Sequence, residues 1–158
     1  MLKNRFDPSS VEKKCLEYWN KEKIFSKFHE SGSQNFSIMM PPPNITGSLH
    51  MGHALTFTLQ DILVRFQSKM GKRSLWQPGT DHAGIATEII VEKRILNNNE
   101  TKAKLGREKF LDEVWKWKDI SGNKIVDQLK ILGTCADWKK SKFTLDSDLC
   151  KVVNKVFV

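Results

Sequence analysis

Three consecutive prolines at 41–43 constrain the fold of this 158-residue chain more than any other feature of its sequence. Proline fixes φ and lacks a backbone N–H, so the stretch excludes a helix and forces an extended turn. The short apolar run 36–40, which the prolines bound on one side, is typical of a strand. Apolar residues then recur at helical spacing over 48–70, so a helix follows the turn.

The same order of strand and helix repeats in the next segment. Residues 74–77 form a second short apolar run, closed by Pro78 and Gly79, and 85–96 again has helical spacing. Strands that alternate with helices indicate a βαβ unit with a parallel sheet and a right-handed crossover. The sequence therefore predicts an α/β fold with parallel strands and flanking helices.

Further helices are expected on both sides of this unit. Ser9 and Glu12 have the spacing of a capping box, which predicts a first helix that runs to about Lys23. Beyond the polar break at 97–99, the stretches 107–132 and 146–157 have the apolar periodicity of amphipathic helices.

The charge balance leaves two interpretations open. The chain has 26 Lys and Arg residues against 18 Asp and Glu, and the net charge of +8 attracts polyanions such as nucleic acid. Lysines scattered along solvated helix faces give the same total, so composition alone does not decide between the two.

The cysteines and the hydropathy pattern bear on location. The three cysteines are too few and too far apart for a disulfide framework or a zinc site, which fits a reducing cytoplasm. No run approaches the roughly 20 apolar residues that cross a bilayer, and residues 1–7 lack the apolar core of a signal peptide. We therefore expect a cytoplasmic protein without a membrane partner.

The turn between the first strand and its helix, residues 44–53, is the first candidate site. Open α/β sheets bind ligands where strands end and helices begin, and free N–H groups there favour phosphate. Gly47 and Gly52 leave room for the close approach of a nucleotide. His50 and His53 share one helix face and can donate hydrogen bonds to neighbouring phosphate oxygens, which would stabilise a transition state that gains negative charge.

Two plainer interpretations compete with a nucleotide site. Most chance occurrences of a His-x-Gly-His pattern are ordinary surface or half-buried histidines. A zinc site is less favoured, because no Cys or carboxylate accompanies the pair at ligand spacing. The preceding strand, the prolines and the two glycines favour the nucleotide site.

The second strand ends in a loop, residues 79–84, which should lie beside the first because parallel strands emerge at the same edge of a sheet. The carboxylate of Asp81 suits the cationic amino group of an amino acid, and His82 could reach the nucleotide. The alternative, that Asp81 only caps the following helix, fits the local sequence equally well.

At these two loops the chain resembles the class I aminoacyl-tRNA synthetases, and among them the valyl-tRNA synthetase family in particular. The stretch 41–54, PPPNITGSLHMGHA, is similar to the extended form of that family's HIGH signature, and 79–87, GTDHAGIAT, is similar to its second loop. The resemblance covers essentially the whole chain, since it extends to FDP at 6–8, LKILG at 129–133 and FTLD at 143–146.

The resemblance implies a division of the chain and a set of roles. Residues 1–34 would form an N-terminal helical extension, and residues 35–158 the first half of a Rossmann-like domain of the HIGH superfamily, ending before the editing insertion. The catalytic residues would be His50 and His53. ATP would be bound by Thr46, His50, Gly52, His53 and His82, and valine by Pro42, Asn44 and Asp81.

The implied activity is that of a valine–tRNA ligase. Valine and ATP, which enters with Mg²⁺, give valyl-adenylate and pyrophosphate, and the valyl group then passes to the terminal ribose of tRNA(Val). The full-length enzyme is expected to be a monomer. The family's lysine-rich KMSKS signature and anticodon-binding domain are not in this sequence, so we expect half of a site that is inactive alone. A split sheet would also expose a strand edge and apolar surface, which predicts instability or aggregation.

Three other functions stay open at this point. A nucleotidyltransferase of the HIGH superfamily would use the same histidines, although the loop at Asp81 argues against it. A synthetase for isoleucine or leucine is closer, but those families usually carry a different run before the histidines. A basic RNA-binding module descended from a synthetase would not need an intact His50, Asn44 and Asp81.

Overall fold

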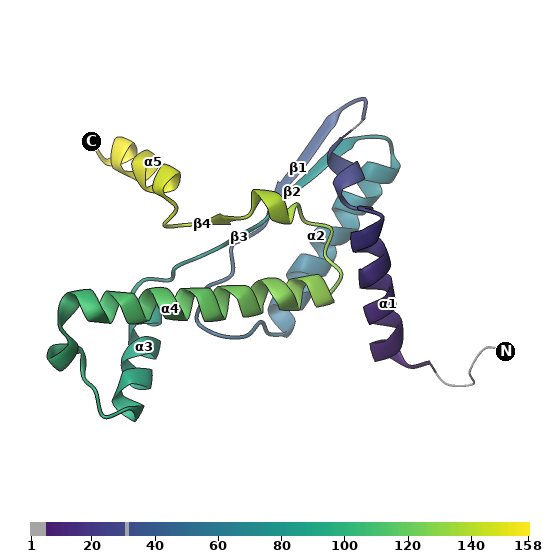
Figure 1. Ribbon diagram of the computed structural model, residues 1–158. Helices are drawn as coiled ribbons and strands as arrows, with labels where there is room; N and C mark the ends of the chain where they lie inside the picture. The colour runs from purple at the N-terminus through teal and green to yellow at the C-terminus, as the bar shows by residue number, and fades with distance from the viewer. Residues whose placement is uncertain (1–5, 31) are drawn as a thin grey trace.

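The computed structural model describes residues 6–30 and 32–158 of the chain (Figure 1). Residues 1–5 of the predicted extension, and Ser31, lie outside the described residues. The elements follow in the order α1 (Pro8–Lys21), the 3-10 helix η1 (Ser26–His29), β1 (Asn35–Met39), α2 (Met51–Lys69), β2 (Arg73–Gln77), β3 (Gly79–Thr80), α3 (Ile85–Asn97), α4 (Lys102–Ile131), the 3-10 helix η2 (Trp138–Lys140), β4 (Lys142–Phe143) and α5 (Ser147–Phe157).

A βαβ unit forms the centre of the molecule, as the sequence predicts. Strands β1 and β2 pair in parallel, with Asn35 opposite Arg73 and Met39 opposite Gln77, and helix α2 connects them. A second parallel pair, β3 with β4, continues from β2 beyond the buried Pro78. This second pair was not predicted, because strands of two residues each have no periodicity that a sequence could show.

The core lies between α2, β2 and α4. Its largest buried side chains come from all three elements, and each is worth about 1.5–3 kcal/mol when fully removed from water; they include Phe57, Val64, Trp76, Ile125 and Leu129. The buried indole of Trp76 keeps its polar atom satisfied, since Nε1 donates to Oε1 of Gln60 over 3.0 Å.

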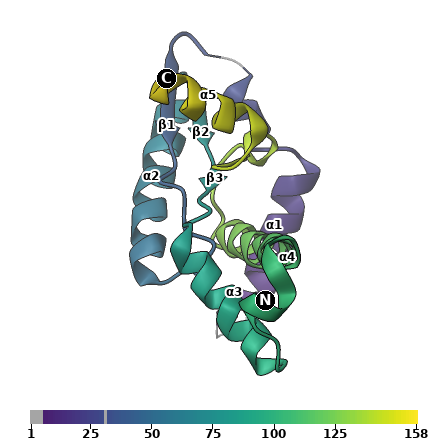
Figure 2. The same cartoon turned by 90° about the vertical axis from the view of Figure 1, so that its left-hand side faces the viewer.

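The regular part of helix α4 begins at Arg107, as predicted. Gly106, within the bounds of α4, has φ 75° and ψ 169°, which lie outside the helical region and separate a short first segment from the rest. Before it, the hydroxyl of Thr101 accepts from the backbone N–H of Lys104 over 3.2 Å. Figure 2 shows α3 beside α4, where a smaller apolar cluster joins the two helices through Val91, Ile95 and Phe110.

The predicted capping box at Ser9 is wrong. Helix α1 starts two residues earlier, with Asp7 as the N-cap and Pro8 in the first turn, a position that suits the fixed φ of proline. Ser9 instead donates its hydroxyl to the carboxylate of Asp7 over 2.8 Å. The helix also ends at Lys21, and Lys23 follows with φ 50°.

Arg65 joins the N-terminal helices to the rest of the molecule. From α2, its Nε donates to the carboxylate of Asp61 and its Nη2 to the carbonyl of Gly133, each over 2.6 Å. Its guanidinium carbon lies 5.5 Å from the ring centroid of Trp19 and 4.7 Å from that of Phe25. One cation therefore links α1, the segment before η1, α2 and the end of α4.

The apolar residues whose spacing predicted helix α2 are exposed. Phe57 and Val64 are buried, but a row of large apolar side chains on the other side is exposed: Leu55, Leu59, Ile62, Leu63, Phe66 and Met70. Among the described residues, β1 pairs with β2 alone, so its other edge is free. The predicted free strand edge and apolar surface are both present.

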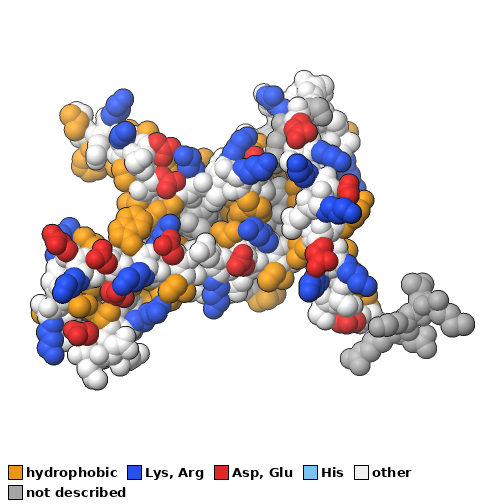
Figure 3. Space-filling view, in the orientation of Figure 1, with side chains coloured by type: hydrophobic (Ala, Val, Ile, Leu, Met, Phe, Trp, Pro, Cys, Tyr) orange, Lys and Arg blue, Asp and Glu red, His pale blue; other side chains and the backbone are white. Residues whose placement is uncertain are grey.

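The positive charge is spread over the surface. On the face that Figure 3 shows, Lys and Arg side chains alternate with Asp and Glu, which favours the solvated-helix interpretation there. Apolar side chains gather on α5 in the same view, where Val156 and Phe157 are exposed. No helix within residues 6–30 and 32–158 is long and apolar enough to cross a membrane.

Candidate functional site

The two predicted loops lie side by side, as expected. Asn44 and Asp81 form an isolated parallel bridge, in which the N–H of Ile45 donates to the carbonyl of Asp81 over 3.0 Å. The N–H of Asp81 in turn donates to the carbonyl of Pro43 over 2.9 Å. Ile45 is only 2% exposed, so its side chain fixes the first loop in the core. Two of the predicted valine ligands are therefore held against each other by backbone hydrogen bonds.

The histidine pair closes the N-terminus of α2. His50 is the N-cap residue, and its Nδ1 accepts from the N–H of Gly52 over 3.1 Å. Its own N–H donates to Nδ1 of His53 over 3.3 Å, and the ring centroids lie 4.0 Å apart. Because both Nδ1 atoms accept hydrogen bonds, each neutral ring carries its proton on Nε2. The pair thus offers two N–H donors at a helix N-terminus, where anions are favoured.

The environment of His53 favours the neutral ring. Its imidazole stacks on Phe57 with centroids 6.0 Å apart and an interplanar angle of 20°. Burial, and then repulsion from His50, lowers the pKa of His53 below its usual 6.5. At neutral pH this histidine is therefore a hydrogen-bond donor without a full positive charge.

Gly52 leaves room for the His50 ring. A Cβ at residue 52 would lie 2.9 Å from Cε1 and 3.1 Å from Nδ1 of that ring, so the ring would have to shift. A Cβ at Gly47 would meet nothing within 4 Å. The approach of a nucleotide was the predicted role of both glycines, and at Gly52 the space that the His50 ring occupies is a second role within the protein.

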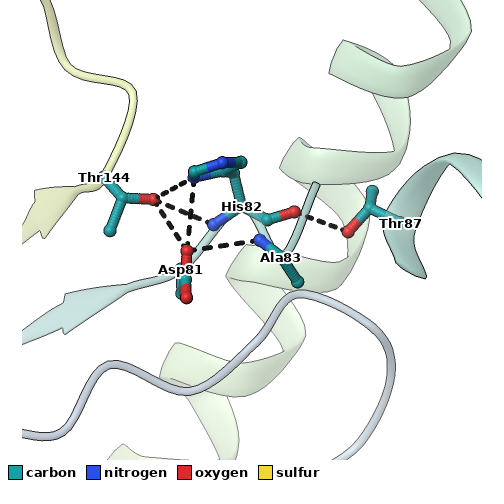
Figure 4. Close-up of polar contacts among 5 residues, drawn as sticks. All are labelled: Asp81, His82, Ala83, Thr87 and Thr144. Carbon is teal, nitrogen blue, oxygen red and sulfur yellow. Dashed lines mark hydrogen bonds and ion pairs between the residues drawn. The ribbon is translucent and has the colours of Figure 1, made fainter. Parts of the chain in front are cut away.

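A polar cluster forms around Asp81 in the second loop (Figure 4). Its Oδ1 accepts from the hydroxyl of Thr144 over 3.0 Å and from the N–H of Ala83 over 3.2 Å, and lies 3.2 Å from Nδ1 of His82. The hydroxyl of Thr144 accepts from the N–H of His82 over 2.9 Å. Within the described residues all these contacts use Oδ1, and none uses Oδ2.

The single proton of the Thr144 hydroxyl determines the state of His82. Since that proton goes to Asp81, the 2.7 Å contact between the hydroxyl and Nδ1 of His82 requires the proton of the ring to lie on Nδ1. In the neutral ring Nε2 is then an acceptor, the opposite of the first two histidines. His82 suits a hydroxyl or amino group better than a phosphate oxygen.

The interpretation of Asp81 as a helix cap is wrong. Helix α3 has Gly84 as its N-cap, with φ 49°, and no side chain caps it. Asp81 lies too far ahead of the helix and turns its carboxylate to Thr144 and Ala83 instead.

An apolar pocket of about 230 Å³ lies beside the two loops. Pro42 and Thr144 both line it, so the wall of the pocket and the cluster at Asp81 share one residue. The remaining apolar lining comes from Met39, Met40, Pro78 and Leu149.

The structure keeps the predicted residues in two groups. His50, Gly52 and His53 form one, and Asp81 and His82 the other; within the described residues no hydrogen bond, ion pair or ring contact joins them. Thr46, in the loop between them, is half-buried. Within residues 6–30 and 32–158, no three His, Cys, Asp or Glu side chains lie together in a way that could hold a metal ion.

Thr144 is the functional candidate that the sequence analysis missed. It follows β4, and 62 residues separate it from His82. Only its place in the FTLD stretch at 143–146 could have drawn attention to it.

Comparison with protein families and curated proteins gives consistent matches. A family model described as tRNA synthetases class I (I, L, M and V) matches residues 14–158. The Valine–tRNA ligase of Buchnera aphidicola subsp. Baizongia pistaciae is 50% identical over 159 residues, 100% of this chain and 17% of the relative. That of a Nitratiruptor species is 51% identical over 157 residues, 98% of this chain and 18% of the relative. The chain thus spans less than a fifth of these relatives.

Among solved structures, the chain is similar to LeuRS of Agrobacterium radiobacter K84 in a ternary complex with tRNA and LeuAMS. The TM-score is 0.73 at 21% identity, and the match covers 97% of this chain and 17% of that one. This likeness concerns the fold, and with the parallel strands and the N-terminal helix it confirms the predicted α/β class.

Proposed function

This chain belongs to the class I tRNA synthetases, and from that premise we propose that it carries the ATP and valine half-site of a valine–tRNA ligase. The observation that carries the proposal is that Nδ1 of His50 and Nδ1 of His53 both accept backbone hydrogen bonds, which leaves two Nε2 donors at the start of α2. The relatives that are 50% and 51% identical and are named Valine–tRNA ligase support valine as the amino acid.

In the first step the carboxylate of valine attacks the α-phosphorus of ATP, which enters with Mg²⁺, and pyrophosphate leaves. Negative charge builds on the phosphate oxygens, and the Nε2 atoms of His50 and His53 can donate hydrogen bonds to those oxygens. Removal of one such oriented donor typically lowers kcat about 10²–10³-fold. The helix N-terminus adds a partial positive charge, and Gly52 keeps the His50 ring in place.

The second loop supplies the contacts to the amino acid. Oδ2 of Asp81 would receive the ammonium group of valine, with Asn44 held beside it by the backbone bridge. The pocket at Pro42 has room for an aliphatic side chain, and among the described residues that line it Lys142 alone is charged. His82 would accept a hydrogen bond from a hydroxyl or amino group of the nucleotide, and Thr46 would approach the ATP from the first loop.

The rest of the proposal concerns the complete protein. It would transfer the valyl group to the terminal ribose of tRNA(Val), act as a monomer and reside in the cytoplasm. This chain would contribute half of the activation site and would not aminoacylate alone.

The test is exchange between ATP and pyrophosphate, measured on the complete gene product with each amino acid in turn. We expect valine to support the fastest exchange and the 158-residue chain alone to support almost none. Absence of exchange with every amino acid would refute the activity. A rate from the chain alone that matches the complete product would refute the half-site.

A further inference from the structure

We propose that Gln128, on helix α4, is a positioning residue for the histidine pair. The expected effect on catalysis rests on the proposed function, whereas the hydrogen bond itself does not depend on it. Oε1 of Gln128 accepts from the backbone N–H of Leu49 over 2.9 Å, across 79 residues of chain. Leu49 directly precedes His50, so this hydrogen bond holds the turn at the point where the histidines begin.

A second contact from the same helix holds the other end of the loop. Nε1 of Trp117 donates to the carbonyl of Ile45 over 2.7 Å. The Ile45 side chain belongs to the same buried cluster as Ile125 of α4, and its Cγ2 lies 3.9 Å from where a Cβ of Gly122 would be. Residues 45–49 are thus tied at both ends to one face of α4.

The hydrogen bonds from Trp117 and Gln128 hold different parts of the first loop. Trp117 fixes the part of the loop that pairs with the second loop, since Ile45 also donates to the carbonyl of Asp81. Gln128 fixes the part next to His50, whose own N–H reaches Nδ1 of His53. Loss of the Gln128 contact should therefore disturb the histidines while the bridge at Asp81 persists.

Ser121 provides a matched control on the same helix face. It lies four residues after Trp117 and seven before Gln128, so all three project to one side of α4. It is buried, and its hydroxyl has no hydrogen-bond partner among the described residues. Ser121→Ala alters the packed face without removing an anchor.

The experiment compares Gln128→Met, Gln128→Glu and Ser121→Ala in the complete gene product. Methionine keeps the length of the side chain and loses the acceptor, whereas glutamate keeps an oxygen acceptor. Two quantities are measured: amide hydrogen exchange of the segment that contains Leu49, and the kcat and KM values for ATP–pyrophosphate exchange.

Gln128→Met should speed exchange at the Leu49 amide about tenfold and lower kcat about five- to tenfold, as expected for one lost hydrogen bond, with the KM for valine unchanged. Gln128→Glu should restore most of both quantities, and Ser121→Ala should alter neither. Unchanged amide exchange in Gln128→Met would overturn the inference, as would equal losses in Gln128→Met and Gln128→Glu. If the unaltered protein shows no pyrophosphate exchange, the proposed function fails, and the amide measurement still decides whether Gln128 holds the turn.

Discussion

Replacing Gly52 with alanine should displace the His50 ring without a large change in the stability of α2. The new Cβ would lie 2.9 Å from Cε1 and 3.1 Å from Nδ1 of the imidazole. These atoms form the end of a side chain, so the ring moves and the backbone stays. The hydrogen bond from residue 52 to Nδ1 is then lost, and Nε2 no longer points where it did.

Two effects on stability nearly cancel in this variant. Alanine favours a helix over glycine by about 0.5–1 kcal/mol. Loss of an N-cap acceptor destabilises a helix by about 0.5–2 kcal/mol. We therefore expect the change in the free energy of unfolding to lie between a gain of about 0.5 and a loss of about 1.5 kcal/mol. The effect on rate should be far larger, since one misplaced donor lowers kcat about 10²–10³-fold.

The assay is a double-mutant cycle in the complete gene product, with kcat for ATP–pyrophosphate exchange as the measured quantity. Gly52→Ala should slow exchange strongly alone and add little once His50→Ala is present, because both changes remove the same contact. Gly47→Ala, where the added Cβ meets nothing within 4 Å, shows the effect of an alanine elsewhere in the turn. If Gly52→Ala slows exchange as much without His50 as with it, the reasoning is refuted.

Three further changes test other contacts. Burial and a neighbouring imidazole lower the pKa of His53 from 6.5, so near that pH the folded state binds fewer protons than the unfolded state. The free energy of unfolding, measured by urea titration at a series of pH values, should therefore fall as the pH drops below 6.5. His53→Gln should make this pH dependence weaker. Gly122→Ala should raise the free energy of unfolding by about 0.5–1 kcal/mol in the same titration, since its Cβ would meet Ile45 only at 3.9 Å; a decrease would show that α4 has no room there. Thr144→Val should raise the KM for valine about tenfold, because Asp81 loses the hydroxyl that fixes it, and the KM for ATP by a smaller factor, because His82 loses its contact with the same hydroxyl; an unchanged KM for valine would contradict the role of Thr144 at Asp81.

The sequence predicted the elements better than their packing. Apolar spacing over 48–70 predicted α2 correctly, yet the residues that produce that spacing, such as Leu59 and Phe66, are exposed. The buried face is instead Phe57 and Val64. The spacing of apolar residues shows that a segment is helical. It does not show which face of the helix packs against a neighbouring element, and that neighbour determines which residues are buried.

The candidate site was predicted where it is local and missed where it is not. Seven consecutive residues, 47–53, contain the histidines, the glycines and the N–H groups of the first loop, so their spacing in the sequence is enough to bring them together. Thr144 and Gln128 reach the loops from 62 and 79 residues away, and their positions depend on how β4 and α4 dock. That Asp81 does not cap α3 likewise depends on the position of Thr144, which no local pattern supplies.

The contacts of Arg65 have a consequence for the order in which a growing chain can assemble. Its guanidinium faces Trp19 and Phe25 near the beginning of the chain, but one of the two oxygens that orient it belongs to Gly133. A ribosome adds about 5–20 residues per second, so roughly 5–20 s separate the emergence of Phe25 from that of Gly133. During this interval Arg65, which Trp19 and Phe25 pack against, lacks one of the two oxygens that orient its guanidinium.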